Sequence, residues 1–538
     1  MGGASWKPLA VLGAAQFLMV LDQAVMNVSI SQLVADFHTS VTTIQAVIAL
    51  YSLVMAALMI AGGKLGDIWG RRRAFRLGHA IYGVGSLLTA LAWSIPSLLI
   101  GWSVLEGIGA ALVLLALAAL AALTYQGKAR ALAYGVLGGV SGAGIAVGPI
   151  LGGWVTTNLS WRLVFAGEVV VVIAILLAVP RLLRKDAPRP GAELDGVGAA
   201  LCSLGLALIV LGVLEAGTWG WLQPRNSPIE PFGFSLTPFV VAAGFGVLAI
   251  FRWWQRRREA HDREPLVHFR LFEIGALRSG LGTFLFQNLI LMGIFFAISL
   301  YLQIVQGLDA FETGLRMLPV SVALFVTALA GSRLTGRYSP KAIVRAGLGL
   351  LVVASVLLLA TIQPDIADVA FGIAMAVLGI GMGLIVSQLG NVVQSSVGEE
   401  DRSEAGGLQY TAQQLGASLG TALIGAVVIS GLVAGFSGKI ADDPRISDTV
   451  EKQVGVKLEG SVSFVSTDQI RAAAEKEGLD KATTDALVDN YADAQLTALK
   501  TGLLFAGLLA CAAFLMTRRL PGRADAARGP PEPAPQAA

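Results

Sequence analysis

The chain has 538 residues, of which 55% are hydrophobic and only 14% are charged, and its formal net charge at pH 7 is +3. Soluble globular domains carry roughly 25% charged residues, so this composition excludes an ordinary soluble protein and favours one that lies largely in lipid. The small net charge gives no indication of a nucleic-acid-binding surface. The two cysteines, Cys202 and Cys511, both lie in apolar runs, which argues against a disulfide framework or a cysteine metal site.

Apolar stretches long enough to cross a bilayer recur from residues 8–30 to residues 501–517. A spanning helix needs about 20 largely apolar residues, and about fourteen such stretches are present. Basic residues fall in alternate loops, which the positive-inside rule places in the cytoplasm together with both termini. These loops are residues 64–76, 128–130, 181–189, 252–278, 333–345 and 518 onward. We therefore predict an all-α integral membrane protein.

An internal repeat relates the two halves of the chain. Lys64-Leu65 aligns with Arg333-Leu334, and Gly144-x-x-x-Gly148 aligns with Gly416-x-x-x-Gly420 at nearly the same offset. Parallel repeats about an axis along the membrane normal characterise one large transporter architecture, in which the substrate binds between the halves. We predict an N-terminal six-helix half (1–185), a segment (186–278) that holds two inserted helices (194–216 and 237–254) and a cytoplasmic linker, a C-terminal six-helix half (279–517) and a disordered tail (518–538).

The longest loop outside the membrane, residues 436–493, precedes the last span and is acidic, so we expect it to be extracellular. Apolar and polar residues alternate over residues 454–465, which suggests a hairpin. Residues 467–477 and 481–499 have helical patterns, and the second helix continues into the last span. We expect an ordered cap.

The loop after the second span reads Gly63-Lys64-Leu65-Gly66-Asp67-Ile68-Trp69-Gly70-Arg71-Arg72-Arg73 and resembles the cytoplasmic signature of the Major Facilitator Superfamily. Glycines permit a tight turn, and an aspartate can pair with arginines or meet a helix N-terminus. We interpret the motif as a latch that opens when the halves rock. Its residues are Gly63, Asp67, Gly70, Arg71 and Arg72. A purely topogenic basic loop is the alternative, but it requires no aspartate framed by glycines.

The fifth span contains Gly144-Ile145-Ala146-Val147-Gly148-Pro149-Ile150-Leu151-Gly152-Gly153, which is similar to the motif of the antiporter branches of that superfamily. Glycines on a helix face allow close contact with a neighbouring backbone, and a proline kink can act as a hinge. The antiporter interpretation rests on Gly144, Gly148, Pro149, Gly152 and Gly153. Ordinary helix packing is the alternative.

Further segments resemble the fourteen-helix drug:proton antiporter family. They are Leu21-Asp22-Gln23-Ala24-Val25-Met26-Asn27-Val28, Trp161-Arg162-Leu163-Val164-Phe165 and Gly314-Leu315-Arg316-Met317-Leu318-Pro319. The resemblance covers about residues 15 to 425. It implies the Major Facilitator fold, with two six-helix halves plus two extra central helices. It also implies a monomer in the bacterial plasma (inner) membrane that exports small amphipathic or cationic drugs in exchange for protons, without a cofactor, a metal or catalytic residues.

Two carboxylates inside predicted spans are candidates for proton coupling. The family usually has an arginine and a glutamine in the fourth span, where this chain has Ser103 and Glu106. An ionised carboxylate near the bilayer centre costs roughly 2.5–3.5 kcal/mol on insertion scales, so Asp22 and Glu106 need a partner, a wet cavity or a proton. We predict that both couple transport to protons, with helix–helix hydrogen bonding as the alternative. Glu168, on a helix that the fold places at the periphery, is expected to be structural.

Polar stripes on two helices predict a wet substrate cavity. The stripes contain Gln23 and Asn27 in the first span, and Asn288, Phe295 and Ser299 in the span after the linker. Aromatic faces, including Trp102, are suited to stacking on planar or cationic ligands, although aromatic residues at helical spacing more often pack than bind.

Other functions remain open at this point. A uniporter, an importer or a lipid-moving transporter of the same fold is the main alternative, and the motif around Pro149 argues against it. A polytopic membrane enzyme is a remote alternative, because the sequence has no phosphate-binding Gly-x4-Gly-Lys-[Ser/Thr] motif.

Overall fold

The computed structural model describes residues 5–189, 193–331, 333–334, 337–398, 401–447, 450 and 464–522. The described residues form helices and no strands. Thirteen helices within them are long and apolar enough to cross a membrane. A further helix, α4 (Arg71–Ala90), begins with an arginine-rich segment that lowers its hydropathy, yet it packs between α6 (Gly107–Thr124) and α8 (Trp161–Leu182). These helices agree with the predicted number of about fourteen spans.

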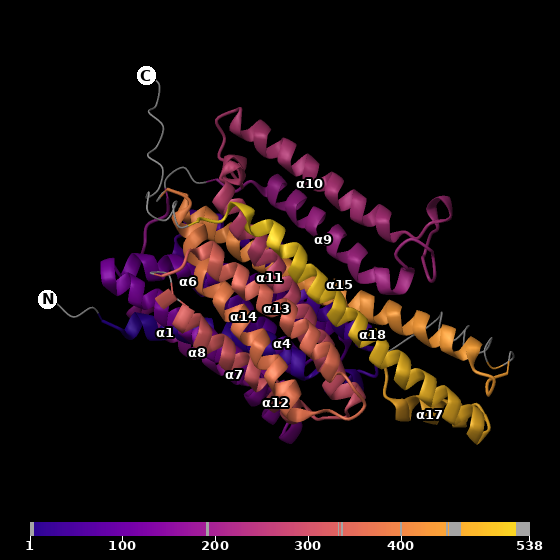
Figure 1. The fold of residues 1–538 in the computed structure, drawn as a ribbon. Helices are drawn as coiled ribbons and strands as arrows, with labels where there is room; N and C mark the ends of the chain where they lie inside the picture. The colour runs from indigo at the N-terminus through magenta and orange to yellow at the C-terminus, as the bar shows by residue number, and fades with distance from the viewer. Residues whose placement is uncertain are drawn as a thin grey trace.

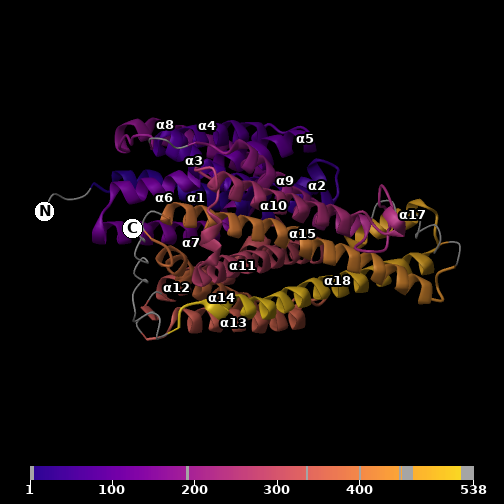
Figure 2. The same cartoon turned by 90° about the horizontal axis from the view of Figure 1, so that it is seen from above.

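The first part of the chain forms a bundle in which α4 and α8 lie on the outer side, away from the C-terminal helices (Figure 2). The fourth span bends through a π-helical segment, η1, between α5 and α6. The remaining helices of this part are α1 (Lys7–Val28), α2 (Ile30–Asp36), α3 (Val41–Trp69), α5 (Ile95–Leu98), η1 (Leu99–Glu106) and α7 (Gly127–Asn158).

Two long helices, α9 (Gly196–Trp219) and α10 (Thr237–Glu259), lie side by side at one flank of the molecule (Figure 1). They match the two inserted helices predicted from the sequence, and each runs a few residues further than predicted. α9 also packs on α3 and on α15 (Arg402–Asp442), so the inserted pair contacts both parts of the transporter. A short 3-10 turn, η2 (Pro231–Gly233), lies in the loop between them.

The C-terminal bundle places α13, α14 and α18 opposite α4 and α8 (Figure 2). The last residues of α18 and the first residues of α1 lie at the same end of the molecule (Figure 1). The basic loops lie at this end, which is therefore the cytoplasmic one. The Lys341 ammonium there donates to the carbonyl of Arg518 over 2.6 Å. The elements of this part, besides α15, are η3 (Phe269–Glu273), α11 (Gly275–Leu300), the π-helical η4 (Tyr301–Val305), α12 (Ala310–Gly331), α13 (Pro340–Thr361), α14 (Asp368–Ser395), α17 (Thr467–Lys476), α18 (Lys481–Met516) and η6 (Thr517–Arg519).

The internal repeat extends to helix packing. A Cβ atom on Gly144 or Gly148 of α7 would press on Val20 or Ala24 of α1. In the C-terminal bundle, Gly416 and Gly420 of α15 face the backbone of α11 at Leu285 and Leu289 in the same way. Equivalent glycines therefore bring equivalent helix pairs together.

Two helices predicted in the loop before the last span are present. The helix predicted over 467–477 is α17, and the one predicted from residue 481 runs without interruption into the last span as α18. Both helices are capped, by Ser466 and Asp480 respectively. The predicted hairpin over 454–465 lies outside the described residues except for its last two, and so does the tail beyond residue 522.

Candidate functional site

Three carboxyl groups meet inside the N-terminal bundle. Asp22 of α1, Glu106 of η1 and Glu168 of α8 each place one oxygen within 4.8 Å of the others. Asp22 and Glu106 are fully buried, and Glu168 is 2% exposed. We call these three residues the carboxyl cluster. The sequence predicted Asp22 and Glu106 as candidates but set Glu168 apart, because sequence does not reveal which face of α8 turns inward.

Each member of the carboxyl cluster accepts hydrogen bonds on one oxygen. The Trp102 indole donates to Asp22 over 2.7 Å, and the Thr89 hydroxyl donates to Glu106 over 3.0 Å. The hydroxyl groups of Tyr82 and Ser86 donate to Glu168, over 3.1 and 3.2 Å. The second oxygen of each carboxyl group has no hydrogen-bond partner among the described residues. Within those residues, none of the three forms an ion pair either.

Close backbone contact holds Glu106 in this position. Gly85 of α4 and Gly101 of η1 face each other so tightly that a Cβ on Gly85 would lie 2.7 Å from the Glu106 side chain. Glycine at both positions lets α4 approach η1 directly. The π-helical turn carries both Trp102 and Glu106, and such turns frequently occur at functional sites.

Trp102 packs against the carboxyl cluster in this conformation and is buried. Its ring stacks on Tyr51 with centroids 4.5 Å apart, and it is 1% exposed. In this conformation Tyr51 therefore occupies one face of the Trp102 ring, and the predicted role of Trp102 in a substrate cavity stays a prediction. Its indole ring and hydrogen bond instead cover Asp22 on the side of α3.

The polar stripe of α1 meets the C-terminal bundle. The Gln23 amide donates to the Gln414 side chain of α15 over 3.3 Å. The backbone carbonyl of Asn27 accepts from Gln303 of η4 over 3.2 Å, and Gln303 also accepts from the amide of Ser31. Gln303 and Gln414 were not among the predicted site residues, since their role depends on contacts between distant parts of the chain.

The predicted cavity residues of α11 are less exposed than a wet cavity requires. Phe295 is 5% exposed and Ser299 is fully buried, with a hydroxyl that has no partner among the described residues. Asn288 is half-buried and donates to the carbonyl of Phe284 in its own helix. In this conformation the three residues contribute mainly to packing.

The glycine motif of α7 joins two different helices. Gly144, Gly148 and Gly152 face α1, while Gly153 faces the backbone of Ala310 at the start of α12. The carbonyl of Pro149 lies against Gly314 of α12. The motif is therefore a contact between the two bundles as well as a packing surface within one.

The latch motif forms a compact turn at the cytoplasmic end. Asp67 pairs with Arg71 over 3.1 Å, and Gly70 adopts a φ of 87° that favours glycine. The Asp186 carboxylate accepts from the backbone amides of Arg71 and Arg72, over 2.5 and 3.1 Å. Gly63 lies within α3 beside Leu115 of α6. The sequence predicted that Asp67 would pair with an arginine or meet a helix N-terminus. The structure gives the first role to Asp67 and the second to Asp186.

Replacing Asp186 with alanine should destabilise the protein by about 1 kcal/mol, because two amides at the start of α4 lose their acceptor. The thermal unfolding midpoint of the purified protein measures this loss. Asp186→Asn keeps an acceptor and should retain most of the stability. Equal losses in the two variants would contradict the capping role.

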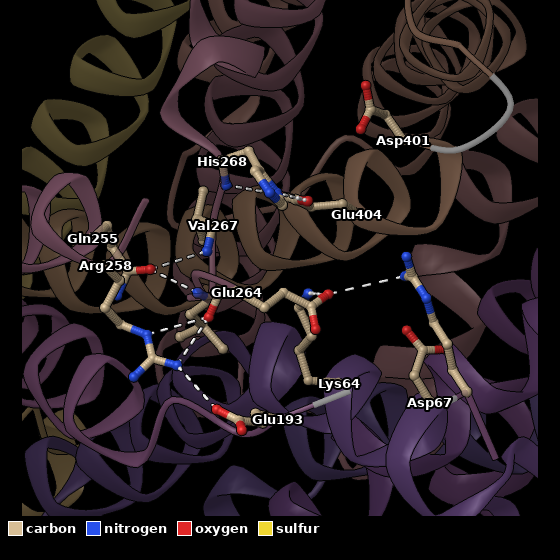
Figure 3. Close-up of polar contacts among 12 residues, drawn as sticks. Lys64, Asp67, Glu193, Gln255, Arg258, Glu264, Val267, His268, Asp401 and Glu404 are labelled. Atoms are coloured by element: carbon tan, nitrogen blue, oxygen red, sulfur yellow. Dashed lines mark hydrogen bonds and ion pairs between the residues drawn. The ribbon is translucent and has the colours of Figure 1, made fainter. Parts of the chain in front are cut away.

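The segment 260–274, which we call the linker, connects α10 to α11 and ties the latch region to the C-terminal bundle (Figure 3). Glu264 pairs with Lys64 of α3 over 2.7 Å. The His268 ring lies 2.8 Å from Glu404 of α15, which also accepts from the His268 backbone amide over 2.6 Å. Further along, Arg270 pairs with Asp401 over 2.9 Å. Movement of either bundle at this end must therefore move the linker.

The hydrogen bond to Glu404 raises the pKa of His268 above its ordinary value of 6.5, against burial and the charges of Lys64 and Arg270. A raised folded-state pKa means that the pair stabilises the protein fully below about pH 6.5, and that this contribution is lost as the pH rises through the folded-state pKa.

Glu404→Gln should therefore lower the thermal midpoint more at pH 6 than at pH 8.5, by an amount equivalent to less than about 1 kcal/mol for this partly exposed pair. Asp401→Asn is the matched control, because its partner Arg270 does not titrate in this range. Its effect should be the same at both pH values. A pH-independent loss in Glu404→Gln would refute the pairing.

Comparisons with known proteins identify the family and the fold. The family model described as Major Facilitator Superfamily matches residues 12–421. Among solved structures, a bacterial homolog of the human lysosomal transporter Spinster has a TM-score of 0.60 at 15% identity, covering 96% of this chain and 98% of that one. A D-xylose-proton symporter has a TM-score of 0.56 at 13% identity, covering 90% and 99%. At these identities the structures support the fold alone.

The curated relatives are similar over most of their length. The puromycin resistance protein pur8 of Streptomyces alboniger is 31% identical, covering 88% of this chain and 93% of that protein. The tetracenomycin C resistance and export protein of Streptomyces glaucescens is 29% identical, covering 82% and 80%. The multidrug efflux pump LfrA of Mycolicibacterium smegmatis is also 29% identical, covering 89% and 90%.

Proposed function

Since this chain belongs to the Major Facilitator Superfamily, we propose that it exports small amphipathic or cationic compounds across the bacterial plasma membrane in exchange for protons. The substrate class is proposed from the relatives, whose names refer to puromycin resistance, tetracenomycin C export and multidrug efflux. An open apolar groove between α1 and α7 suits the apolar part of such compounds. Its lining includes Leu9, Phe17 and Val140.

The carboxyl cluster is the observation that carries the proposal. Three negative charges whose nearest oxygens lie within 4.8 Å in a buried site would repel one another strongly, and no described basic residue pairs with them. Protons can neutralise such a cluster one at a time. A hard divalent ion is the alternative, but it prefers six or more oxygen ligands, and the indole N–H of Trp102 beside Asp22 cannot serve as one. We infer that the cluster holds protons and that their number changes during transport.

α1 offers a route from proton exchange to movement of the two bundles. One face of this helix contributes Asp22 to the carboxyl cluster, and the next residue, Gln23, contacts Gln414 of α15. A change in the charge of Asp22 therefore acts on a helix that lies at the contact between the bundles. Coupling follows if the two bundle arrangements bind the proton with different affinity.

Contacts between the bundles indicate that this state is closed on the extracellular side. Gln45 near the start of α3 donates to the carbonyls of Thr421 and Ala422 in α15, over 2.9 and 3.2 Å. The hydroxyl of Thr157 at the end of α7 accepts from the amide of Phe311 in α12. We propose that this conformation releases and receives protons from the cytoplasm. Rocking to the opposite state would break these contacts.

Transport by the purified protein in liposomes tests the proposal. An imposed pH gradient should drive accumulation of a cationic dye such as ethidium, and collapsing the gradient with nigericin should stop it. A uniporter or a lipid-moving transporter of the same fold would equilibrate its substrate regardless of the gradient. Dye movement that ignores the pH gradient would therefore exclude proton exchange.

A further inference from the structure

Another cavity lies at the junction of three elements and is lined by residues other than those of the carboxyl cluster. It has a volume of about 220 Å³ and is formed by the start of α3, the end of α9 and the middle of α15. Its lining includes Gln45, Ala46, Glu215 and Gly217.

Glu215 is the charged group of this cavity. It lies in a membrane-spanning helix, is half-buried, and has no hydrogen bond or ion pair among the described residues. The other polar side chains of the lining, which are the hydroxyls of Thr42, Thr43 and Thr218 and the amide of Gln45, are all neutral. An ionisable residue inside a span usually marks a functional site, because its cost must be offset by a partner. A cation in the cavity would supply the partner that Glu215 lacks among the described residues.

The walls of the cavity depend on the contact between the bundles. Gln45 forms part of the lining and reaches across to the backbone of α15, where its side chain lies directly on Gly425. Gly217 of α9 packs against Ala426 of α15. Separation of α3 from α15 would therefore open the cavity, so a ligand bound here favours the closed arrangement.

We propose that this cavity binds the ammonium headgroup of an amphiphile, with Glu215 as its counter-charge and its apolar chain directed along the outside of the bundle. The volume is below the roughly 300–1,000 Å³ of pockets that enclose drug-sized ligands, so it suits a headgroup and not a whole drug. Leu214 and Ile429 supply apolar contacts beside the carboxylate. None of the residues that line the cavity belongs to the carboxyl cluster.

Such a headgroup can come from two sources, a soluble cationic amphiphile or an amine-bearing phospholipid. Two measurements on the purified full-length protein separate them. Calorimetric titration with hexyltrimethylammonium measures binding of a soluble cationic amphiphile, and 1-hexanol serves as the neutral probe. Native mass spectrometry after addition of phosphatidylethanolamine or phosphatidylglycerol reports the second.

Glu215→Gln should weaken binding of hexyltrimethylammonium or retention of phosphatidylethanolamine by about tenfold, because the counter-charge is lost. Binding of 1-hexanol and of phosphatidylglycerol should not change. Glu230→Gln, in the loop after α9, removes an exposed acid outside the cavity and should have no effect. Ala46→Leu fills the cavity without removing charge, and it should weaken binding of the same ligand as Glu215→Gln does.

Weaker binding of hexyltrimethylammonium by Glu215→Gln identifies a site for soluble ligands, and weaker retention of phosphatidylethanolamine identifies a lipid site. Both outcomes support the proposed cation site. Equal affinity of wild type and Glu215→Gln for both amine ligands would overturn it. Asp22→Asn should keep this binding, so failure of the proposed proton exchange and failure of the cation site are distinguishable.

Discussion

Replacing Asp22 with asparagine is expected to abolish the accumulation of substrate that a proton gradient drives. A gradient of one pH unit is worth about 1.4 kcal/mol per proton and supports about tenfold accumulation for each proton exchanged. Asparagine has nearly the shape of aspartic acid and can keep the contact with Trp102, but it cannot release a proton. Accumulation should therefore fall to the level of passive equilibration while the protein stays folded.

Dye accumulation in liposomes at a fixed gradient measures this effect, with substrate exchange at equal pH as the second readout. Exchange should survive in Asp22→Asn, since it requires no net proton movement. Asp365→Asn, in an exposed loop, serves as a matched control and should behave as wild type. Full accumulation by Asp22→Asn would remove Asp22 from the mechanism.

Replacing Gly153 with valine should prevent the extracellular side from closing. A side chain at this position would overlap the carbonyl of Ala310 and press on Phe311, both on α12. Overpacking of this kind costs about 1–3 kcal/mol, which shifts the ratio of two conformations by about 5–150-fold. Export should fall strongly, since alternating access needs both conformations.

The matched control is Gly138→Val in the same helix, because a Cβ there meets no atom within 4 Å. Gly138→Val restricts the backbone as Gly153→Val does, but its side chain does not press on α12. Spin labels at Ala35 and Asp365, in a variant without Cys202 and Cys511, measure the separation of the extracellular ends. Gly153→Val should lengthen this distance and Gly138→Val should not. An unchanged distance in Gly153→Val would show that α7 and α12 tolerate the side chain.

Much of the fold follows from local sequence. Long apolar runs, the alternation of basic loops and the repeated glycines predict the spans, their direction and the inserted pair α9 and α10. α17 and α18 were predictable because their caps, Ser466 and Asp480, precede clear helical patterns. These features depend on residues that are close in the chain, where propensity and hydrophobic period decide the structure.

The candidate site was less predictable because it depends on which helix faces meet. Glu168 joins the carboxyl cluster through Tyr82 and Ser86 of α4, a helix about eighty residues away in the chain. Trp102 fits a ligand-stacking residue equally well until its contact with Tyr51 is known. The role of Asp186 at the start of α4 requires the end of α8 to return to the latch. Such contacts leave little trace in a single sequence.

Proton release on substrate binding tests the central claim most directly. The purified protein in weakly buffered detergent, with a pH-sensitive dye, should release protons into solution when ethidium is added. The amount released should fall in Asp22→Asn and in Glu106→Gln, and Asp365→Asn should match the wild type. If wild type and both cluster variants release equal amounts, or none, the carboxyl cluster does not exchange protons with the substrate.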